Sequence, residues 1–297
     1  MKNFPLFTVV FVLLISCYQA VNMGTQGGPL GGKPNTGEQT GPISSRLWTV
    51  IIYMAADNDL EAAAISDFNE LEAVQWGDEP VSILVLMDRA NGYDMTNDNW
   101  TGTRLYEIKS DPLGLTGTMK SPRLDCVELG LSKDSETELN TADPWVLSRL
   151  IDFAKGAYPA EHYALFIWGH GTGWRGGAET GNLPEPVKAI AFDDTTGQYM
   201  SLPSFGRAVS GKGLSIIGFD TCFAALLEVA YEVRNDAKLF FGSEGEILST
   251  GWDYTKLFDD FVNRSNFFDF ELADIIQRQF AAQYSGLNNA TISEVKL

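Results

Sequence analysis

Apolar residues gather in short runs that are separated by polar and glycine-rich stretches. Four of these runs are almost continuously apolar and rich in β-branched or aromatic residues: Trp48–Ala56, Val81–Met87, Tyr163–Trp168 and Leu214–Phe219. Runs of this length and composition are typical of strands that are buried on both faces of a parallel sheet. Residues 238–243 predict a further strand, and residues 101–108 predict a strand or one arm of a hairpin.

Helical patterns lie between these runs. The predicted helices cover residues 60–74, 144–157, 202–209 and 223–233. Asn58 and Asp59 are the expected cap of the first helix, and Asp143 followed by Pro144 opens the second. Because strands alternate with helices, the pattern predicts an α/β fold with helices on both faces of a mostly parallel sheet.

The first residues of the chain carry a targeting pattern. A lysine is followed by an apolar stretch that is too short to span a bilayer comfortably, and Leu14-Ile15-Ser16-Cys17 resembles the lipobox of bacterial lipoproteins. We therefore expect residues 1–17 to be a signal peptide with a lipobox and Cys17 to be lipidated. An ordinary secretory signal that is cut near Ala20 is the alternative. Either signal predicts an exported protein, which in the first case is anchored to the bacterial cell envelope by lipid alone.

Residues 18–46 are rich in Gly, Pro and Thr and have too few apolar residues for a core, so they predict a flexible tether. Residues 47–297 are sufficient for one large domain or two small ones, and because no second linker follows, one domain is expected.

The net charge and the cysteine and histidine content exclude some classes of binding partner and metal site. The formal net charge is -18 at pH 7, which disfavours nucleic acid and anionic lipid and favours cationic ligands. The chain has 3 cysteines and 2 histidines, with no Cys-rich cluster, so no zinc site or other catalytic metal is predicted.

A cysteine and a histidine follow two of the predicted strands. His170, between two glycines, follows Trp168, and Cys222 follows the run that ends at Phe219. Ligands in parallel α/β sheets bind at the carboxyl ends of strands, and a cysteine nucleophile needs a base or a helix N-terminus to form its thiolate. The pair therefore predicts a catalytic dyad. A Cys126–Cys222 disulfide would abolish it, and His162 is expected on the surface.

Several motifs in the same order resemble clostripain-type cysteine peptidases, which belong to the caspase and gingipain clan. They are residues 48–61, Trp168-Gly169-His170-Gly171, Phe192-Asp193-Asp194 and Gly218-Phe219-Asp220-Thr221-Cys222. In this clan a histidine precedes the nucleophilic cysteine by about 50 residues. The resemblance implies a caspase-like three-layer sandwich and an endopeptidase in which Cys222 attacks the substrate, His170 protonates the leaving amine, and the backbone N–H groups of Gly171 and Cys222 form the oxyanion hole.

The resemblance also implies a substrate. Asp220 matches the acidic residue of the family's pocket for Arg or Lys at P1, although a helix cap for Phe223 is an alternative. The candidates for a second acidic residue in this pocket are the segment Ser243-Glu244-Gly245-Glu246 and Asp253. The expected partner is thus a peptide or protein with a basic P1 residue. Thr221 departs from the family, which more often has Ala there. In similar proteins the segment that ends at Leu297 leads into further helices, so the resemblance leaves open whether the domain of residues 47–297 is truncated at its C-terminus.

The sequence also raises a mode of activation and two competing functions. Family members are often activated by internal cleavage, for which Lys188 is the best candidate and Arg175 and Lys212 are weaker ones. No cofactor is expected. The resemblance raises calcium as a possible exception, bound through acidic residues that include Asp193 and Asp194. A catalytically inactive caspase-like binding module and a Cys-His acyltransferase or amidase are the competing functions.

Overall fold

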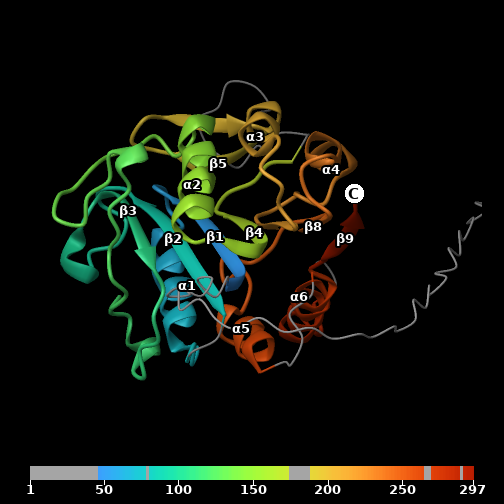
Figure 1. The fold of residues 1–297 in the computed structure, drawn as a ribbon, viewed down its shortest axis with the longest axis horizontal. Coiled ribbons are helices and arrows are strands. Elements are labelled where there is room, and N and C mark those ends of the chain that lie inside the picture. The colour runs from blue at the N-terminus through green and yellow to red at the C-terminus, as the bar shows by residue number, and fades with distance from the viewer. Residues whose placement is uncertain (1–45, 78–79, 174–187, 264–268, 288–289) are drawn as a thin grey trace, which may run out of the picture. The chain divides into compact units, whose positions relative to one another are not determined.

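A seven-stranded sheet organises the computed structural model, which describes residues 46–77, 80–173, 188–263, 269–287 and 290–297 (Figure 1). The strands of this sheet are β1 (Arg46–Ala56), β2 (Val81–Arg89), β3 (Gly102–Glu107), β4 (Ala160–Trp168), β7 (Ile216–Asp220), β8 (Leu239–Gly242) and β9 (Ser293–Lys296). Their spatial order is β3-β2-β1-β4-β7-β8-β9. The five inner strands run parallel, and β3 and β9 pair antiparallel at the two edges.

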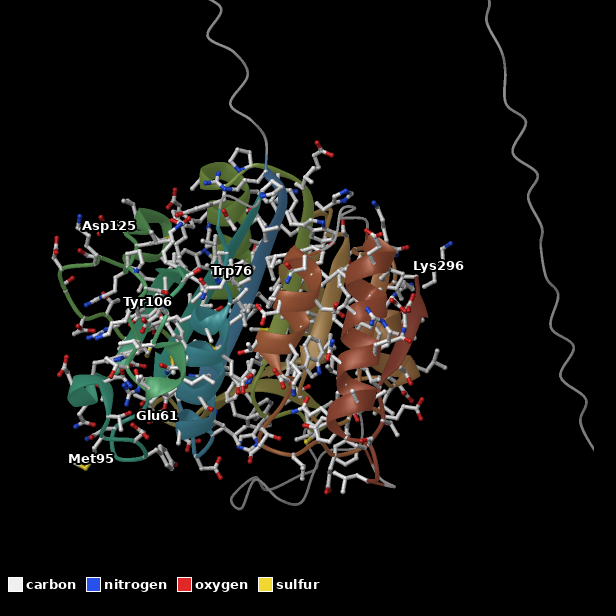
Figure 2. The ribbon with its side chains drawn as sticks, turned by 90° about the horizontal axis from the view of Figure 1, so that it is seen from below. Glu61, Trp76, Met95, Tyr106, Asp125 and Lys296 are labelled. Carbon is white, nitrogen blue, oxygen red and sulfur yellow. The ribbon has the colours of Figure 1, made fainter. Side chains whose placement is uncertain are left out.

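Helices cover both faces of this sheet (Figure 1). On one face lie α1 (Glu61–Ala73), α5 (Tyr254–Val262) and α6 (Asp269–Gln283), and Figure 2 shows these helices in front of the strands. On the other face lie α2 (Pro144–Ala157), α3 (Leu202–Val209) and α4 (Leu227–Val233). Alternate residues of β1 enter the two cores: Val50 and Ile52 pack with α1, α5 and α6, whereas Ile51 and Tyr53 pack with α2, α3 and α4. The predicted three-layer α/β sandwich with a mostly parallel sheet is confirmed.

Some elements were not predicted from the sequence pattern. A small hairpin is formed by β5 (Ala189–Asp193) and β6 (Gln198–Ser201), and β9 adds a further strand beside β8. The helices α5 and α6 also lie beyond the elements that the pattern identified. The residues of β6 and β9 are largely exposed or half-buried, so these strands lack the continuous apolar run that marks an inner strand.

The N-terminal predictions lie almost wholly outside the described residues. These predictions are the signal peptide, Cys17 and nearly all of the tether. Arg46, the last residue of the predicted tether, begins β1. Among the described residues, no helix combines the length and the apolar character that crossing a bilayer requires.

Candidate active site

The loops that carry His170 and Cys222 leave two adjacent strands at the same edge of the sheet. The last residue of β4, Trp168, and the last residue of β7, Asp220, are register partners. The Gly169 N–H donates to the carbonyl of Asp220 over 3.4 Å, so the loops start side by side. The expected placement at the carboxyl ends of parallel strands is observed.

Two glycines allow these loops to pack closely. Gly169 has φ 135°, and a Cβ atom there would lie 2.8 Å from the carbonyl oxygen of Ala55. A Cβ atom at Gly171 would lie 2.6 Å from the carbonyl oxygen of Cys222 and 2.7 Å from Thr221 Oγ1. Both positions are therefore closed to larger side chains without backbone movement. The backbone of Gly171 lies directly against that of Cys222.

His170, Cys222 and Asp220 line one cavity. The rest of its wall comes from the start of α1, the end of β4 and the loop between β8 and α5, through Leu60, Trp168, Gly169, Glu246, Ile247, Leu248, Ser249 and Gly251. The cavity thus joins a thiol, an imidazole and a carboxylate within walls that are partly apolar. A pocket with partly apolar walls and a few convergent polar groups is typical of a ligand-binding or active site.

The His170 ring is held in place by Asp59. Its Nε2 atom lies 2.7 Å from Asp59 Oδ1, and the ring meets Phe192 edge-on at 6.2 Å between centroids. Because a carboxylate only accepts, Nε2 carries the proton of this hydrogen bond, and Nδ1 is the nitrogen left for proton transfer. The sequence offered Asp59 only as a helix cap. In the structure, Asn58 Oδ1 instead accepts from the Leu60 N–H over 3.1 Å.

Cys222 lies in the turn that follows β7 and not at a helix N-terminus. The helix predicted from Phe223 begins at Leu227, because the Phe223 N–H donates to Gly245 O over 2.9 Å and Phe223 has φ 55°. The prediction that a helix terminus activates this thiol is therefore wrong. The Sγ atom accepts from the Ile247 N–H over 3.4 Å, so the loop after β8 positions the thiol on the cavity wall.

Asp220 presents an uncompensated carboxylate to this cavity. Its side chain is buried, and Oδ2 accepts from the Trp252 N–H over 3.0 Å and from the Tyr254 hydroxyl over 3.1 Å. Oδ1 has no hydrogen-bond partner in the structure. Burial raises the pKa of Asp220 to about 7, against the lowering effect of these two donors. The alternative role as a cap is wrong, since α4 starts at Leu227 without a side-chain cap.

The structure separates the candidates for a second pocket acid. Glu246 lines the cavity, and its side chain is exposed. Asp253 does not line it: its carboxylate accepts from the Lys256 N–H over 2.9 Å as the N-cap of α5 and pairs with Lys256 Nζ at 2.6 Å. The expectation that Asp253 faces the same pocket is not met, because the helix start uses its carboxylate.

The remaining histidine and cysteine of the domain lie elsewhere. Neither Cys126 nor Cys222 is in a disulfide, so the alternative Cys126–Cys222 bond is not formed. Burial raises the pKa of Cys126 to about 11, which keeps that thiol protonated. His162, near the start of β4, is half-buried and stacks on Trp48 at 4.8 Å between ring centroids. It lies at the opposite end of the strand from His170.

Lys188 is exposed and directly precedes β5. Both polar groups of the Lys188–Ala189 peptide bond are hydrogen-bonded. The Ala189 N–H donates to Thr172 Oγ1 over 3.0 Å, and the Lys188 carbonyl accepts from the Leu202 N–H over 3.3 Å. Cleavage after Lys188 would require these bonds to open first. Arg175 lies outside the described residues. Lys212 pairs with Asp152 at 2.6 Å.

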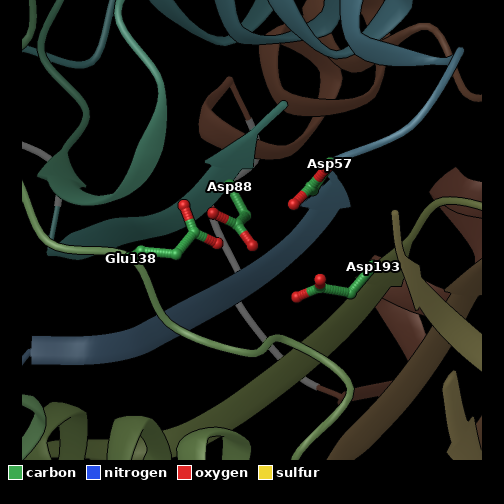
Figure 3. Close-up of side chains that lie close together, drawn as sticks. All are labelled: Asp57, Asp88, Glu138 and Asp193. Carbon is green, nitrogen blue, oxygen red and sulfur yellow. The ribbon is translucent and has the colours of Figure 1, made fainter. Parts of the chain in front are cut away.

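Four acidic side chains form a second group beyond the cavity. This carboxylate cluster consists of Asp57, Asp88, Glu138 and Asp193, and one oxygen from each lies within 4.8 Å of the others. Figure 3 shows the four side chains converging. Of the two acids that the resemblance raised for calcium, Asp193 belongs to the cluster, whereas Asp194 accepts from the Tyr93 hydroxyl over 2.6 Å.

The three-layer sandwich, with a histidine and a cysteine at adjacent strand ends, has the architecture of a caspase-like domain. The chain belongs to the clostripain family, whose model matches residues 52–297. It is 28% identical over 229 residues to clostripain of Hathewaya histolytica, an alignment that covers 71% of this chain and 41% of that protein. The chain thus spans less than half the length of this curated relative.

Solved structures show the same fold. A secreted C11 cysteine protease from Bacteroides thetaiotaomicron, solved with an irreversible peptide inhibitor, is 23% identical with a TM-score of 0.60, covering 84% of this chain and 66% of that one. An inactive zymogen C11 protease from Parabacteroides distasonis is 24% identical with a TM-score of 0.58, covering 85% and 62% of the two chains.

Proposed function

We propose that this chain is an exported cysteine endopeptidase that uses His170 and Cys222 as its catalytic dyad and cleaves after Arg or Lys. The observation that carries the proposal is the shared cavity, in which the thiol and the imidazole lie beside the buried, partly unpartnered carboxylate of Asp220. Membership of the clostripain family supports the same reaction class.

The proposed reaction is acyl transfer to the thiol. The Sγ atom of Cys222, as thiolate, attacks the scissile carbonyl, and the His170 imidazolium gives its proton to the leaving amine. Water then hydrolyses the thioester, with the imidazole accepting its proton. The hydrogen bond to Asp59 occupies Nε2, so Nδ1 is the proposed donor.

Backbone donors are proposed to stabilise the charge that develops on the carbonyl oxygen. The close approach of Gly171 to Cys222 supports an oxyanion hole built from their two N–H groups. Each such donor contributes about 3 kcal/mol to transition-state stabilisation. The requirement for glycine at 171 follows, because a side chain there would displace the Cys222 backbone.

Asp220 is proposed to select the P1 residue. Its Oδ1 atom is buried and has no hydrogen-bond partner in the structure. Burial of such an atom costs free energy unless a cation or a hydrogen-bond donor binds to it. A P1 guanidinium or ammonium supplies both, and Glu246 adds negative charge to the cavity wall. The net charge of -18 also attracts basic substrates from solution.

Export and activation complete the proposal. The N-terminal signal with Cys17 supports a lipid-anchored protein of the bacterial cell envelope, and the Bacteroides thetaiotaomicron relative is described as secreted. The Parabacteroides distasonis relative was solved as an inactive zymogen, which supports activation by internal cleavage. Lys188 remains the proposed site, with local opening before β5 as a requirement.

Hydrolysis of matched fluorogenic peptides tests this function. The protein, before and after limited proteolytic activation, is given peptides that differ only in Arg, Lys or Gln at P1, with Cys222→Ala as the control. Turnover of the basic peptides by the unsubstituted protein alone supports the proposal. Absence of turnover would favour a binding module, and transfer of the acyl group to an added amine, seen in the products, would favour an acyltransferase.

A further inference from the structure

Trp168 lies beside Asp220 in the wall of the cavity. The two residues are register partners at the ends of β4 and β7. Register partners on adjacent parallel strands point to the same face of the sheet, about 4.8 Å apart. Trp168 belongs to the core that α1, α5 and α6 cover, so both side chains project toward that face. The cavity therefore places an indole next to a buried carboxylate.

Asp67, in the middle of α1, holds this indole from behind. The Trp168 Nε1–H donates to Asp67 Oδ2 over 2.7 Å, and both side chains are 2% exposed. Asp67 does not line the cavity, so it acts on the pocket through Trp168. An indole has a single N–H donor, so without Asp67 the ring loses the hydrogen bond that fixes its orientation.

Packing alone does not account for an acid at position 67. In the part of the chain that the structure describes, no Lys, Arg or His pairs with Asp67. Burial, followed by the charges of Asp220 and Glu70, raises the pKa of Asp67 well above its usual range, and the hydrogen bond from Trp168 acts in the opposite direction. An apolar side chain would fill a buried position without these costs. The contact with Trp168 is therefore the interaction that gives this carboxyl a role.

Glu70, one turn later in α1, fixes the other side of the pocket. Its Oε2 atom accepts from the Tyr254 N–H over 2.9 Å, and its carbonyl accepts from the Thr255 hydroxyl over 2.8 Å. The Tyr254 hydroxyl in turn donates to Asp220 Oδ2 over 3.1 Å. The helix α1 thus contacts both aromatic residues that lie beside Asp220. Supporting hydrogen bonds of this kind hold a binding site in one geometry before the ligand arrives.

We propose that Asp67 is a positioning residue for recognition of the P1 side chain. Asp67 keeps the Trp168 indole in one orientation, so that a P1 cation that pairs with Asp220 also packs against the ring. An indole attracts Arg and Lys side chains, and a wall that is already ordered loses less conformational freedom on binding. This role rests on the proposed function, because it assumes that the cavity receives the P1 side chain.

Peptide binding to Cys222→Ala protein, which excludes turnover by this thiol, tests the proposal. Two labelled peptides that differ only in Arg or Gln at P1 are titrated, and Kd is measured by fluorescence anisotropy. Asp67→Leu removes the acceptor at similar volume, so it should weaken binding of the Arg peptide by about 3- to 30-fold and of the Gln peptide by less than about twofold. Asp67→Asn keeps an oxygen that accepts from Trp168 and should keep most of the Arg preference. Ser66→Ala, an exposed neighbour in α1, is the matched control.

A second variant tests whether Asp67 acts through Trp168. Trp168→Phe keeps an aromatic ring but has no N–H to donate, so it should lose a similar part of the Arg preference. Because the two residues form one contact, the double variant Asp67→Leu/Trp168→Phe should bind the Arg peptide no more weakly than the weaker single variant. Equal losses for the Arg and Gln peptides in Asp67→Leu, an unaltered Arg preference, or losses that multiply in the double variant would overturn the role of Asp67.

Hydrolysis by protein with Cys222 intact separates this role from the proposed function. In that protein, Asp67→Leu should raise KM for the Arg peptide and change kcat much less. An Arg preference in binding that depends on Asp67, in a protein that hydrolyses no peptide, would support the positioning role and contradict the peptidase. Hydrolysis of the Arg peptide with a KM that Asp67→Leu does not change would do the reverse. No preference for Arg in the binding of peptides to Cys222→Ala would overturn both the P1 pocket and the role of Asp67.

Discussion

Replacing Asp220 by asparagine removes the charge at the pocket and keeps the shape of the side chain. The asparagine oxygen can still accept from the Trp252 N–H and the Tyr254 hydroxyl, so the local hydrogen bonds survive. The Oδ1 position, which has no partner, becomes an amide that repels a cation. The substitution therefore tests selection of P1 without dismantling the cavity.

The size of the effect follows from the burial of Asp220. Its side chain is 3% exposed, so its interaction with a P1 cation is little screened by water. Loss of one partner in a buried, hydrogen-bonded charge pair costs about 2 to 5 kcal/mol. At 1.36 kcal/mol per factor of ten, kcat/KM for a P1 Arg peptide should fall by about 30-fold to several thousand-fold.

The assay compares kcat/KM for P1 Arg and P1 Gln peptides. In Asp220→Asn, the Arg peptide should lose most of its advantage while the Gln peptide changes by less than about threefold. Asp253→Asn is the matched control, because that acid caps α5 away from the cavity, and it should keep the Arg preference. An equal loss for both peptides in Asp220→Asn, or an unchanged preference for Arg, would refute the role of Asp220.

Three further predictions follow from the same geometry. Burial raises the pKa of the Asp220 carboxyl to about 7, so this group is largely protonated below that pH. The affinity for a cationic inhibitor such as benzamidine should therefore rise between about pH 6 and 8. Inhibition that does not change with pH would contradict this prediction. Asp59→Ala should lower kcat by about 10- to 100-fold with little change in KM, because His170 loses its orienting partner; steady-state kinetics with unaltered kcat would exclude the role. Gly169→Ala should destabilise the fold by about 2 to 4 kcal/mol, because the new Cβ meets Ala55 O at a positive φ; an unchanged urea midpoint would show that the backbone adapts.

The inner sheet could be predicted from sequence because burial on both faces leaves a continuous apolar run. Residues 48–56 and 163–168 show this pattern and form β1 and β4. The edge strand β3 was predicted from residues 101–108, but the edge strand β9 was not, for the opposite reason. In β9, exposed and half-buried residues alternate, and only pairing with β8 makes the segment a strand.

The site was predictable as far as local sequence determined it. His170 and Cys222 follow apolar runs, so their meeting at one edge follows from the topology. The role of Asp59 depends on a contact across 111 residues, which no local pattern reveals. The start of α4 was misplaced because the bond from the Phe223 N–H to Gly245 comes from tertiary structure, and it overrides local helix propensity.

The central claim is that Cys222 is the nucleophile of a peptidase that recognises a basic P1 residue. Peptide mapping by mass spectrometry after incubation with an irreversible peptidyl-arginine chloromethyl ketone tests it most directly. We predict one adduct, on Cys222, with Cys126 unmodified because it is buried, and labelling that slows strongly in His170→Ala and in Asp220→Asn. An adduct on Cys126 alone, or peptide hydrolysis that persists in Cys222→Ala, would contradict the account.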